Sequence, residues 1–302
     1  MTLPRVATIQ DISGVGRCSL TAAIPIFSAM GVQACPLPTA VLSNQTAFES
    51  YAVTALTGQL ADSIALWKKQ GLAFDGVSTG FLTDTEQARL VGEFIDYAKS
   101  GGALVVIDPV MGDAGSLYPI FGQDMLAAFA ELVAKADVIT PNLTEACLLA
   151  GAEYPGQGAH SHELVWEIAH TLSKMGPDTV VVTGVHDRDN AICNMAYVAG
   201  QGKKISVCNR QQGGSFSGTG DILTSIICAC LLRGGDVESA LRLAGQLFER
   251  AIALSIEKGT DPREGVAFEP YLHLLPGTQT LIRQGEDAIC KELTNSPASS
   301  DI

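Results

Sequence analysis

Short apolar runs rich in β-branched residues alternate with longer helical patterns along most of this chain. Expected strands in "RVATIQ", "VQACPLP", "FDGVSTGF", "ALVVIDPV" and "DVITPN" are each followed by an expected helix, near residues 16–30, 55–70, 84–100, 123–135 and 144–150. The runs "ALVVID" and "TVVVTG" are apolar without alternation, which is typical of parallel strands buried on both faces. The pattern predicts a three-layer, doubly wound α/β fold with a mostly parallel central sheet.

The pattern changes after Gly176. The expected strands "TVVVTGV", "AICNMAYVA" and "KKISVCNR" are separated only by the turn sequences "HDRDN" and "GQGKK", which predicts an antiparallel edge. Two helices, near residues 218–233 and 236–258, then complete the fold. We expect a single domain over residues 1–302, without internal repeats, and a frayed end from about residue 290.

Composition excludes several classes of partner. The chain carries 32 acidic and 19 basic residues, a formal net charge of −13. Nucleic acids and anionic membranes need clustered Lys and Arg, so neither is an expected partner. The longest apolar run, Ile222 to Leu232, is shorter than the ~20 residues that cross a bilayer. The start "MTLPRVATIQ" lacks the segments of a signal peptide, so a cytoplasmic protein is expected.

The cysteines and histidines show no metal-binding spacing. We expect all eight cysteines to be reduced and structural, because they lie mostly in apolar stretches without a C-x-x-C pair. They are Cys18, Cys35, Cys147, Cys193, Cys208, Cys228, Cys230 and Cys290. His160, His162 and His170 lie at or after the entry of a loop into a helix, which is typical of surface or capping residues. No zinc site is expected.

Polar side chains gather where the expected strands end. These residues are Asp108, Asp113, Asn142, Glu145, Thr183 and Asp221. The carboxyl ends of parallel strands share one edge of a sheet, where ligands bind in open α/β folds. Oxygen ligands at such an edge suit Mg²⁺, which bridges phosphates. Each residue also has a local explanation, since Asp-Pro starts turns and Thr144 can cap a helix.

The stretch "GTGD", Gly218 to Asp221, places an acid where the chain enters an apolar helix. A helix start offers unpaired backbone N–H groups, so Asp221 can be a simple cap, or the helix start can hold a phosphate with the acid beside it. An earlier pair, Gly14 and Gly16, makes no dinucleotide fingerprint, because Ser19 occupies the third glycine position and no acid follows about 20 residues later. A dehydrogenase is therefore disfavoured.

The ordered set "DPVMGD", "TPNLTEA", "VVTG" and "GTGD", together with "SNQT", resembles the ribokinase-like vitamin kinases, and most closely the pyridoxal/pyridoxamine kinase group. The resemblance runs from about Arg5 to about Lys258. It implies a ribokinase-like fold, a homodimer, and ATP-dependent phosphorylation of the hydroxymethyl group of a vitamin B6 vitamer to its 5′-phosphate. It implies ATP and Mg²⁺ as cofactors and leaves a monovalent-cation requirement open.

The same resemblance implies roles for individual residues. Asp221 would be the base that takes the proton of the substrate hydroxyl. The N–H groups that stabilise the transferring phosphoryl group would come from Gly218, Thr219 and Gly220. The residues implied to contact ATP are Asn142, Thr183, Gly213 and Gly214, the last two in the loop over the adenine. The residues implied to hold Mg²⁺ directly or through water are Asp108, Asp113 and Glu145.

The substrate side departs from the family pattern. Asp11 stands where pyridoxal kinases usually carry a serine, Leu42 where many have a stacking Phe and Phe81 where many have Tyr, whereas Thr46 agrees. A carboxylate at position 11 would bond a protonated ring nitrogen or an amine, which favours pyridoxamine or pyridoxine. The alternative is that Asp11 caps the following helix.

Two other functions stay open. A hydroxymethylpyrimidine kinase of thiamin synthesis acts on a similar flat heterocycle that bears a hydroxymethyl group, although "LSNQT" favours a B6 vitamer. A non-catalytic vitamer-binding protein would keep the ring pocket but would need neither Asp221 nor the metal-binding acids.

Overall fold

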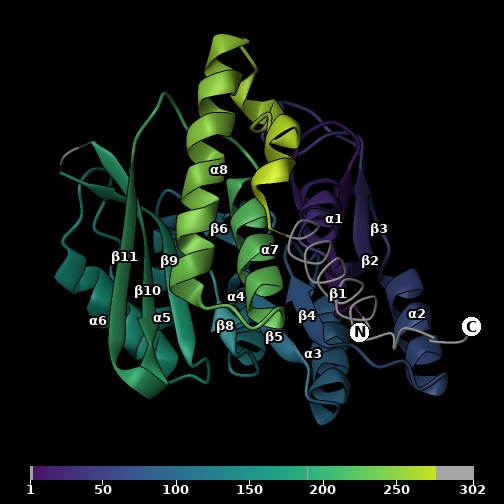
Figure 1. The fold of residues 1–302 in the computed structure, drawn as a ribbon. Coiled ribbons are helices and arrows are strands. Elements are labelled where there is room, and N and C mark those ends of the chain that lie inside the picture. Colours follow the sequence, from purple (N-terminus) through teal and green to yellow (C-terminus); the bar gives the residue numbers. More distant parts are fainter. Residues whose placement is uncertain (1–2, 189, 277–302) are drawn as a thin grey trace, which may run out of the picture.

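A nine-stranded sheet forms the centre of the computed structural model, which describes residues 3–188 and 190–276 (Figure 1). The strand order is β11-β10-β9-β8-β5-β4-β1-β2-β3. The strands are β1 (Arg5–Ser13), β2 (Gln33–Leu42), β3 (Val53–Ala55), β4 (Gly76–Thr79), β5 (Leu104–Ile107), β8 (Val138–Ile139), β9 (Thr179–Asp187), β10 (Ala191–Val198) and β11 (Lys203–Arg210). The central strands pair in parallel, which confirms the doubly wound α/β prediction.

Helices cover both faces of this sheet. One face packs against α1 (Ser19–Ala29), α7 (Thr219–Leu232) and α8 (Val237–Glu257). The other packs against α2 (Thr57–Lys69), α3 (Thr85–Ser100), α4 (Gln123–Val133), α5 (Leu143–Ala150) and α6 (His162–Ser173). Smaller elements are the hairpin β6 (Gly112–Asp113) and β7 (Ser116–Leu117) and the 3₁₀ turns η1 (Ala199–Gln201), η2 (Pro262–Glu264) and η3 (Glu269–Leu274). Within the described residues, no helix combines the length and apolar character needed to span a bilayer.

The continuous apolar runs form strands that supply both hydrophobic cores. In β5, Val105 and Ile107 pack into the core under α2 to α6, whereas Val106 between them packs into the core under α1, α7 and α8. In β9, Val180 and Val181 divide between the two cores in the same way. Successive side chains of a strand point to opposite faces, so a strand covered on both sides has no polar face.

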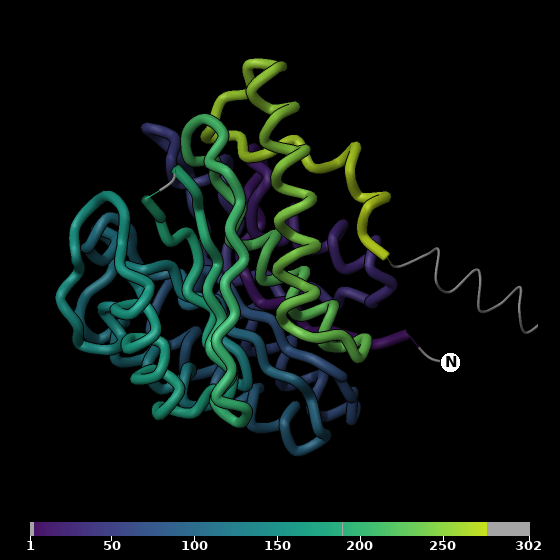
Figure 2. Tube along the Cα trace, turned by 60° about the vertical axis from the view of Figure 1, so that its left-hand side comes forward, coloured from purple at the N-terminus to yellow at the C-terminus, as the bar shows by residue number. Residues whose placement is uncertain are grey.

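The antiparallel edge predicted after Gly176 is confirmed, since β10 pairs antiparallel with both β9 and β11. Figure 2 shows α8 running beside β11, and α8 packs on one face of this part of the sheet. The opposite edge also ends in an antiparallel strand, β3, which the sequence did not suggest. The predicted fraying from about residue 290 lies outside the described residues.

The prediction that all cysteines are reduced is wrong for one pair. Cys193 of β10 and Cys208 of β11 are cross-strand partners with a Cα–Cα distance of 4.0 Å, and they form a disulfide. The five other cysteines of the described chain are free: Cys18, Cys35, Cys147, Cys228 and Cys230. The remaining one, Cys290, lies outside the described residues. Hairpin register brought Cys193 and Cys208 together, a constraint that the search for short cysteine spacings missed.

Candidate active site

The start of α7 closes the carboxyl edge of the sheet. Gly218 is the residue before the helix and has φ +78°, in the left-handed region that favours glycine. A Cβ on Gly218 would lie 1.9 Å from the carbonyl oxygen of Arg17, so no side chain fits there. The Arg17 backbone N–H donates to the Glu264 carbonyl at 2.9 Å. The loop before α1, the start of α7 and η2 therefore lock together at this point.

Asp221 lies in the first turn of α7 but does not cap it. The N-cap is Gly218, and no side chain caps this helix start. The Asp221 carboxylate instead faces the backbone N–H of Ser19, at the start of α1. Burial, with a smaller contribution from the charge of Asp11, raises the pKa of Asp221 to about 7. A carboxylate with such a pKa is suited to accept a proton near neutral pH.

Ser19 joins Asp221 to Asp11. Its hydroxyl donates to Asp11 Oδ1 at 2.5 Å, and the Ser13 hydroxyl donates to Asp11 Oδ2 at 2.9 Å. Asp11 is 4% exposed within β1, and burial raises its pKa. The residue before α1 is Cys18, without a side-chain cap, so Asp11 is not the helix cap that the sequence left open.

Asp108 follows β5 and lies beside the first turn of α7. A Cβ built on Gly220 would be 3.5 Å from Asp108 Oδ2. The Thr224 hydroxyl donates to the same oxygen at 3.3 Å and lies 2.8 Å from the Thr140 hydroxyl. Burial and the charges of Glu145 and Asp221 raise the pKa of Asp108 well above its usual value. Three carboxyl groups thus share one partly enclosed edge.

Glu145 forms a capping box at the start of α5. Its Oε2 accepts the Asn142 backbone N–H at 2.9 Å, and the Asn142 side chain accepts the Glu145 backbone N–H at 2.9 Å. Glu145 Oε1 also accepts the Met111 N–H at 3.0 Å. The N-cap is therefore Asn142, whereas Thr144, suggested from sequence, accepts the Gly115 N–H. Burial raises the pKa of Glu145 to about 8 despite these donors.

Asp113 and an aromatic cluster complete the edge. Asp113 is exposed in the β6–β7 hairpin, and its Oδ1 accepts the Ala114 N–H. Burial and the charges of Glu145, Asp113, Asp108 and Asp221 together raise the pKa of Tyr118, so its phenol lies within electrostatic reach of all four acids. Tyr118 also belongs to an aromatic row in which the ring centroid of Phe121 lies 6.4 Å from Tyr118 and 5.9 Å from Phe81.

The remaining sequence-derived residues lie around this edge at varying exposure. Thr183 of β9 is half-buried and bridges to Asn142, which places it beside the start of α5. Gly213 and Gly214 are exposed in the segment between β11 and α7. Thr46 is exposed after β2, whereas Leu42 at the end of β2 is only 3% exposed.

A divalent cation fits the chemistry of these donors. Asp108, Glu145 and Asp113 supply carboxylate oxygens, the ligand type that Mg²⁺ prefers. Among the residues that the structure describes, no Lys or Arg forms an ion pair with Asp108, Glu145 or Asp221. Burial raises the pKa values of Asp108, Glu145 and Asp221, and no positive charge offsets this effect; a bound cation would supply one.

Ser19, Tyr118 and Gln45 belong to the same region but were not assigned a role from sequence. Gln45, within "SNQT", donates to the Ser217 hydroxyl at 3.1 Å and to the Arg263 carbonyl at 2.6 Å, so it ties its loop to the approach to α7. Gln45 could have been found from the sequence, because it lies in the "SNQT" segment that contributes to the family resemblance. Ser19 and Tyr118 act through contacts between distant segments, which no local pattern indicates.

Comparisons with known proteins find relatives that match most of this chain. The sequence profile of the phosphomethylpyrimidine kinase family matches residues 15–264. Pyridoxal kinase PdxY of Burkholderia lata is 29% identical over 248 residues, which are 79% of this chain and 84% of that protein.

Two solved structures are similar over almost the whole chain. A Bacteroides thetaiotaomicron protein named as a phosphomethylpyrimidine kinase and crystallised with pyridoxal has a TM-score of 0.86 and 38% identity, covering 92% of this chain and 98% of its own. A Leishmania donovani pyridoxal kinase in complex with ADP and pyridoxamine shares the fold, with a TM-score of 0.81 and 21% identity over 91% and 96% of the two chains.

Proposed function

Because the chain belongs to the pyridoxal kinase family of the ribokinase-like superfamily, we propose that it phosphorylates the hydroxymethyl group of a vitamin B6 vitamer with ATP. The observation that carries this proposal is Asp221, a carboxylate with a pKa of about 7 in the first turn of α7, next to buried Asp108. A vitamer-binding protein without catalysis would have no use for this grouping of acids.

Asp221 takes the proton of the substrate hydroxymethyl group while the oxygen of that hydroxymethyl group attacks the γ-phosphorus of ATP. The bond from the γ-phosphorus to the bridging oxygen breaks, and ADP leaves with the electron pair. Backbone N–H groups of Gly218, Thr219 and Gly220 point out of the start of α7 and stabilise the charge on the phosphoryl oxygens. Residues Asp108, Asp113 and Glu145 would hold Mg²⁺, which would neutralise charge on the phosphates.

The proposed vitamer pocket lies between Asp11 and the aromatic row. Phe81 and Phe121 offer apolar ring surface, and Asp11 offers a carboxyl group already oriented by two serine hydroxyls. Relatives crystallised with pyridoxal, or with ADP and pyridoxamine, support a B6 ring and a nucleotide as the ligands. The second candidate is a hydroxymethylpyrimidine kinase, favoured by the description of the matching profile.

The first test measures ATP turnover with pyridoxal, pyridoxamine, pyridoxine and hydroxymethylpyrimidine side by side. We expect the highest kcat/KM with a B6 vitamer and no turnover without Mg²⁺. A clear preference for hydroxymethylpyrimidine would select the second candidate, and the absence of turnover with every acceptor would contradict a kinase.

Asp221→Asn and Asp221→Ala test the mechanism. Asn keeps the volume but accepts no proton, so we expect kcat to fall by about 10²–10⁴-fold, the usual loss for a general base. Stability should change little in Asp221→Asn, because the carboxylate caps no helix and the amide oxygen can still face the Ser19 N–H, whereas Asp221→Ala loses that acceptor. Vitamer phosphorylation and thermal unfolding are measured for both. A near-normal kcat in Asp221→Asn would remove Asp221 as the base.

A further inference from the structure

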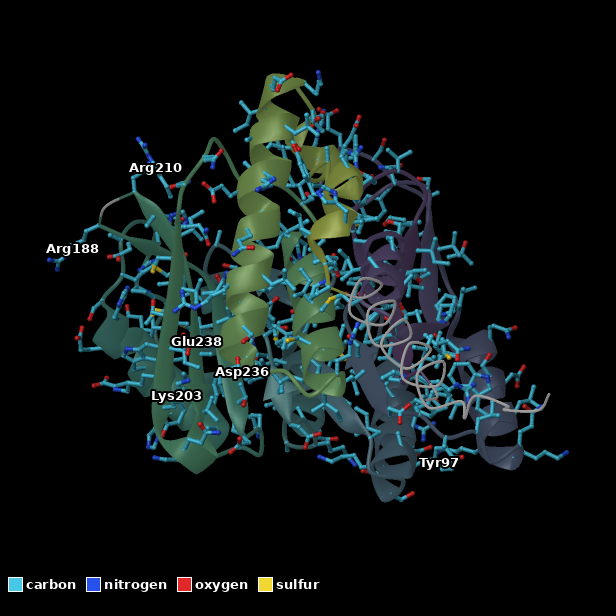
Figure 3. The ribbon with its side chains drawn as sticks, viewed as in Figure 1. Tyr97, Arg188, Lys203, Arg210, Asp236 and Glu238 are labelled. Atoms are coloured by element: carbon cyan, nitrogen blue, oxygen red, sulfur yellow. A yellow bond between two sulfur atoms is a disulfide. The ribbon has the colours of Figure 1, made fainter. Side chains whose placement is uncertain are left out.

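A second group of chemically active side chains lies at the outer end of the antiparallel edge. His162 is the first residue of α6, Asp187 is the last residue of β9 and Cys193 lies in β10. One ligand atom from each lies within 4.8 Å of the other two. Figure 3 labels Arg188 and Arg210 where they project from this end of the sheet. In the sequence, Arg188 directly follows Asp187, and Arg210 is two residues after Cys208.

The His162 ring has an unused ligand atom. Its Nε2 is fully buried and has no hydrogen-bond partner in the described structure. The Asp187 carboxylate lies close to it, with Oδ2 3.5 Å from Nε2, beyond a good hydrogen bond. An imidazole nitrogen that is removed from water without a partner costs free energy, and a metal ion would satisfy it.

The Cys193–Cys208 disulfide decides whether the two sulfur atoms at this place can bind a metal ion. While the bond is intact, neither sulfur is available as a thiolate. Reduction with a water-soluble phosphine transfers two electrons to the disulfide and one oxygen from water to the phosphine, and the two sulfurs take up the two protons. The backbone pairing of β10 with β11 then keeps the two thiols adjacent, because Cys193 and Cys208 are direct register partners.

We propose that the reduced chain binds one Zn²⁺ through His162 Nε2, the Asp187 carboxylate and the sulfurs of Cys193 and Cys208. Two sulfurs, one nitrogen and one oxygen form a four-ligand set typical of tetrahedral zinc, and the soft sulfurs disfavour Mg²⁺. Binding displaces the two thiol protons. The oxidised chain keeps only the histidine and the carboxylate, so zinc affinity depends on the redox state.

The proposed zinc site lies at the same end of the sheet as the candidate active site. Thr183 precedes Asp187 in β9, and β11 leads into the segment that carries Gly213 and Gly214. A zinc ion would join α6, β9, β10 and β11 at one point, whereas the disulfide joins only β10 and β11. The zinc form would thus fix the helix to the sheet edge.

Zinc binding is measured on the metal-free chain in two forms, untreated and reduced with phosphine, the latter exchanged into anaerobic buffer. A chromogenic chelator competes for Zn²⁺, and excess Mg²⁺ occupies the carboxylates around Asp108. We expect the reduced form to bind one more Zn²⁺ per chain than the oxidised form. Replacing Zn²⁺ with Co²⁺ should give a near-ultraviolet thiolate charge-transfer band. Equal zinc stoichiometry in both forms, or no such band, would overturn the proposal.

Three variants identify the ligands. His162→Ala and Cys208→Ser should each weaken zinc binding by more than about 10-fold, since even supporting contacts of metal ligands contribute that much. Cys35→Ser changes a half-buried thiol that is more than 100 residues away in sequence from the proposed ligands. This variant should bind Zn²⁺ as the unmodified chain does. Circular dichroism checks folding. If His162→Ala does not fold, the cobalt band of Cys208→Ser decides, and an unchanged band would contradict the assignment.

Discussion

Ser19 holds a backbone conformation that its neighbours impose. Its φ of +48° lies in the left-handed region, which costs a residue with a side chain about 1–2 kcal/mol. The hydrogen bond from its hydroxyl to Asp11 and the approach of its N–H to the Asp221 carboxylate keep it there. One strained residue therefore positions both the proposed base and the proposed ring-binding acid.

Ser19→Ala and Ser19→Gly separate these two contacts from the strain. Both variants lose the hydroxyl but keep the N–H that faces Asp221, so we expect KM for the vitamer to rise and kcat to stay near normal. Gly adopts positive φ without penalty, so it should be more stable than Ala by about 1 kcal/mol. Steady-state kinetics and urea unfolding measure these effects. A collapse of kcat in Ser19→Ala, like that expected for Asp221→Asn, would show that the hydroxyl positions the base.

At the scale of the element, α7 depends on what surrounds its first turn. Its body is buried and apolar, and it packs against α1 and α8. Its start, by contrast, meets the Arg17 carbonyl and the Gln45-bonded Ser217. The apolar body anchors the helix, and the loop contacts set where its N–H groups and Asp221 lie.

Gly218→Ala tests this arrangement, with Gly71→Ala as its matched control. Gly71 has φ +63° with no atom within 4 Å of an added Cβ, so Ala there should cost only about 1 kcal/mol. At Gly218 the added Cβ meets the Arg17 carbonyl at 1.9 Å, so we expect a clearly larger loss of stability and a loss of turnover. Urea unfolding and phosphorylation assays compare the two. Equal destabilisation of the two variants would mean that the loop before α1, the start of α7 and η2 move apart at little cost in stability.

At the scale of the whole molecule, three neighbouring acids with raised pKa values, none of which pairs with a Lys or Arg among the described residues, make stability depend on pH. Raised pKa values for Asp108, Glu145 and Asp221 mean that the folded chain keeps protons that the unfolded chain loses near pH 4. Their contribution is fully present below about pH 4 and is lost as pH rises to about 8. Bound Mg²⁺ favours the charged carboxylates and opposes this loss.

We therefore expect the Tm in EDTA to fall between pH 6 and pH 8, and Mg²⁺ to raise Tm more at pH 8 than at pH 6. Asp108→Asn has no titrating group at position 108. Its Tm should therefore fall less between pH 6 and pH 8 than the Tm of the unmodified chain, with a difference of about 2 °C or more. Thermal unfolding of both proteins at the two pH values, with and without Mg²⁺, gives the comparison. Parallel curves for the two proteins would show that Asp108 ionises normally.

The sequence predicted the layers and the location of the edge better than it predicted the contacts there. Runs such as "ALVVID" report burial on both faces, and this property needs no knowledge of neighbours. Asn142 as the N-cap was missed because Thr144 offered an equally good local pattern. The Cys193–Cys208 pair was predictable, since two strands joined by one turn place residues at equal distances from that turn opposite each other. The strain at Ser19 was not, because it arises from segments that meet only in the folded chain.

The contact between the loop before α1 and the segment after α8 joins parts of the chain that are synthesised far apart in time. Arg17 pairs with Glu269 at 2.6 Å although the two residues are 252 positions apart, so the first and last described parts of the chain meet at the same edge. On a ribosome, β1 and β2 emerge long before η2 and η3. Contacts of such long range also slow folding, because closure of the chain precedes the interactions that stabilise it. A nascent chain therefore carries Asp11 and Ser19 without their partner Asp221 until about 200 further residues have been made.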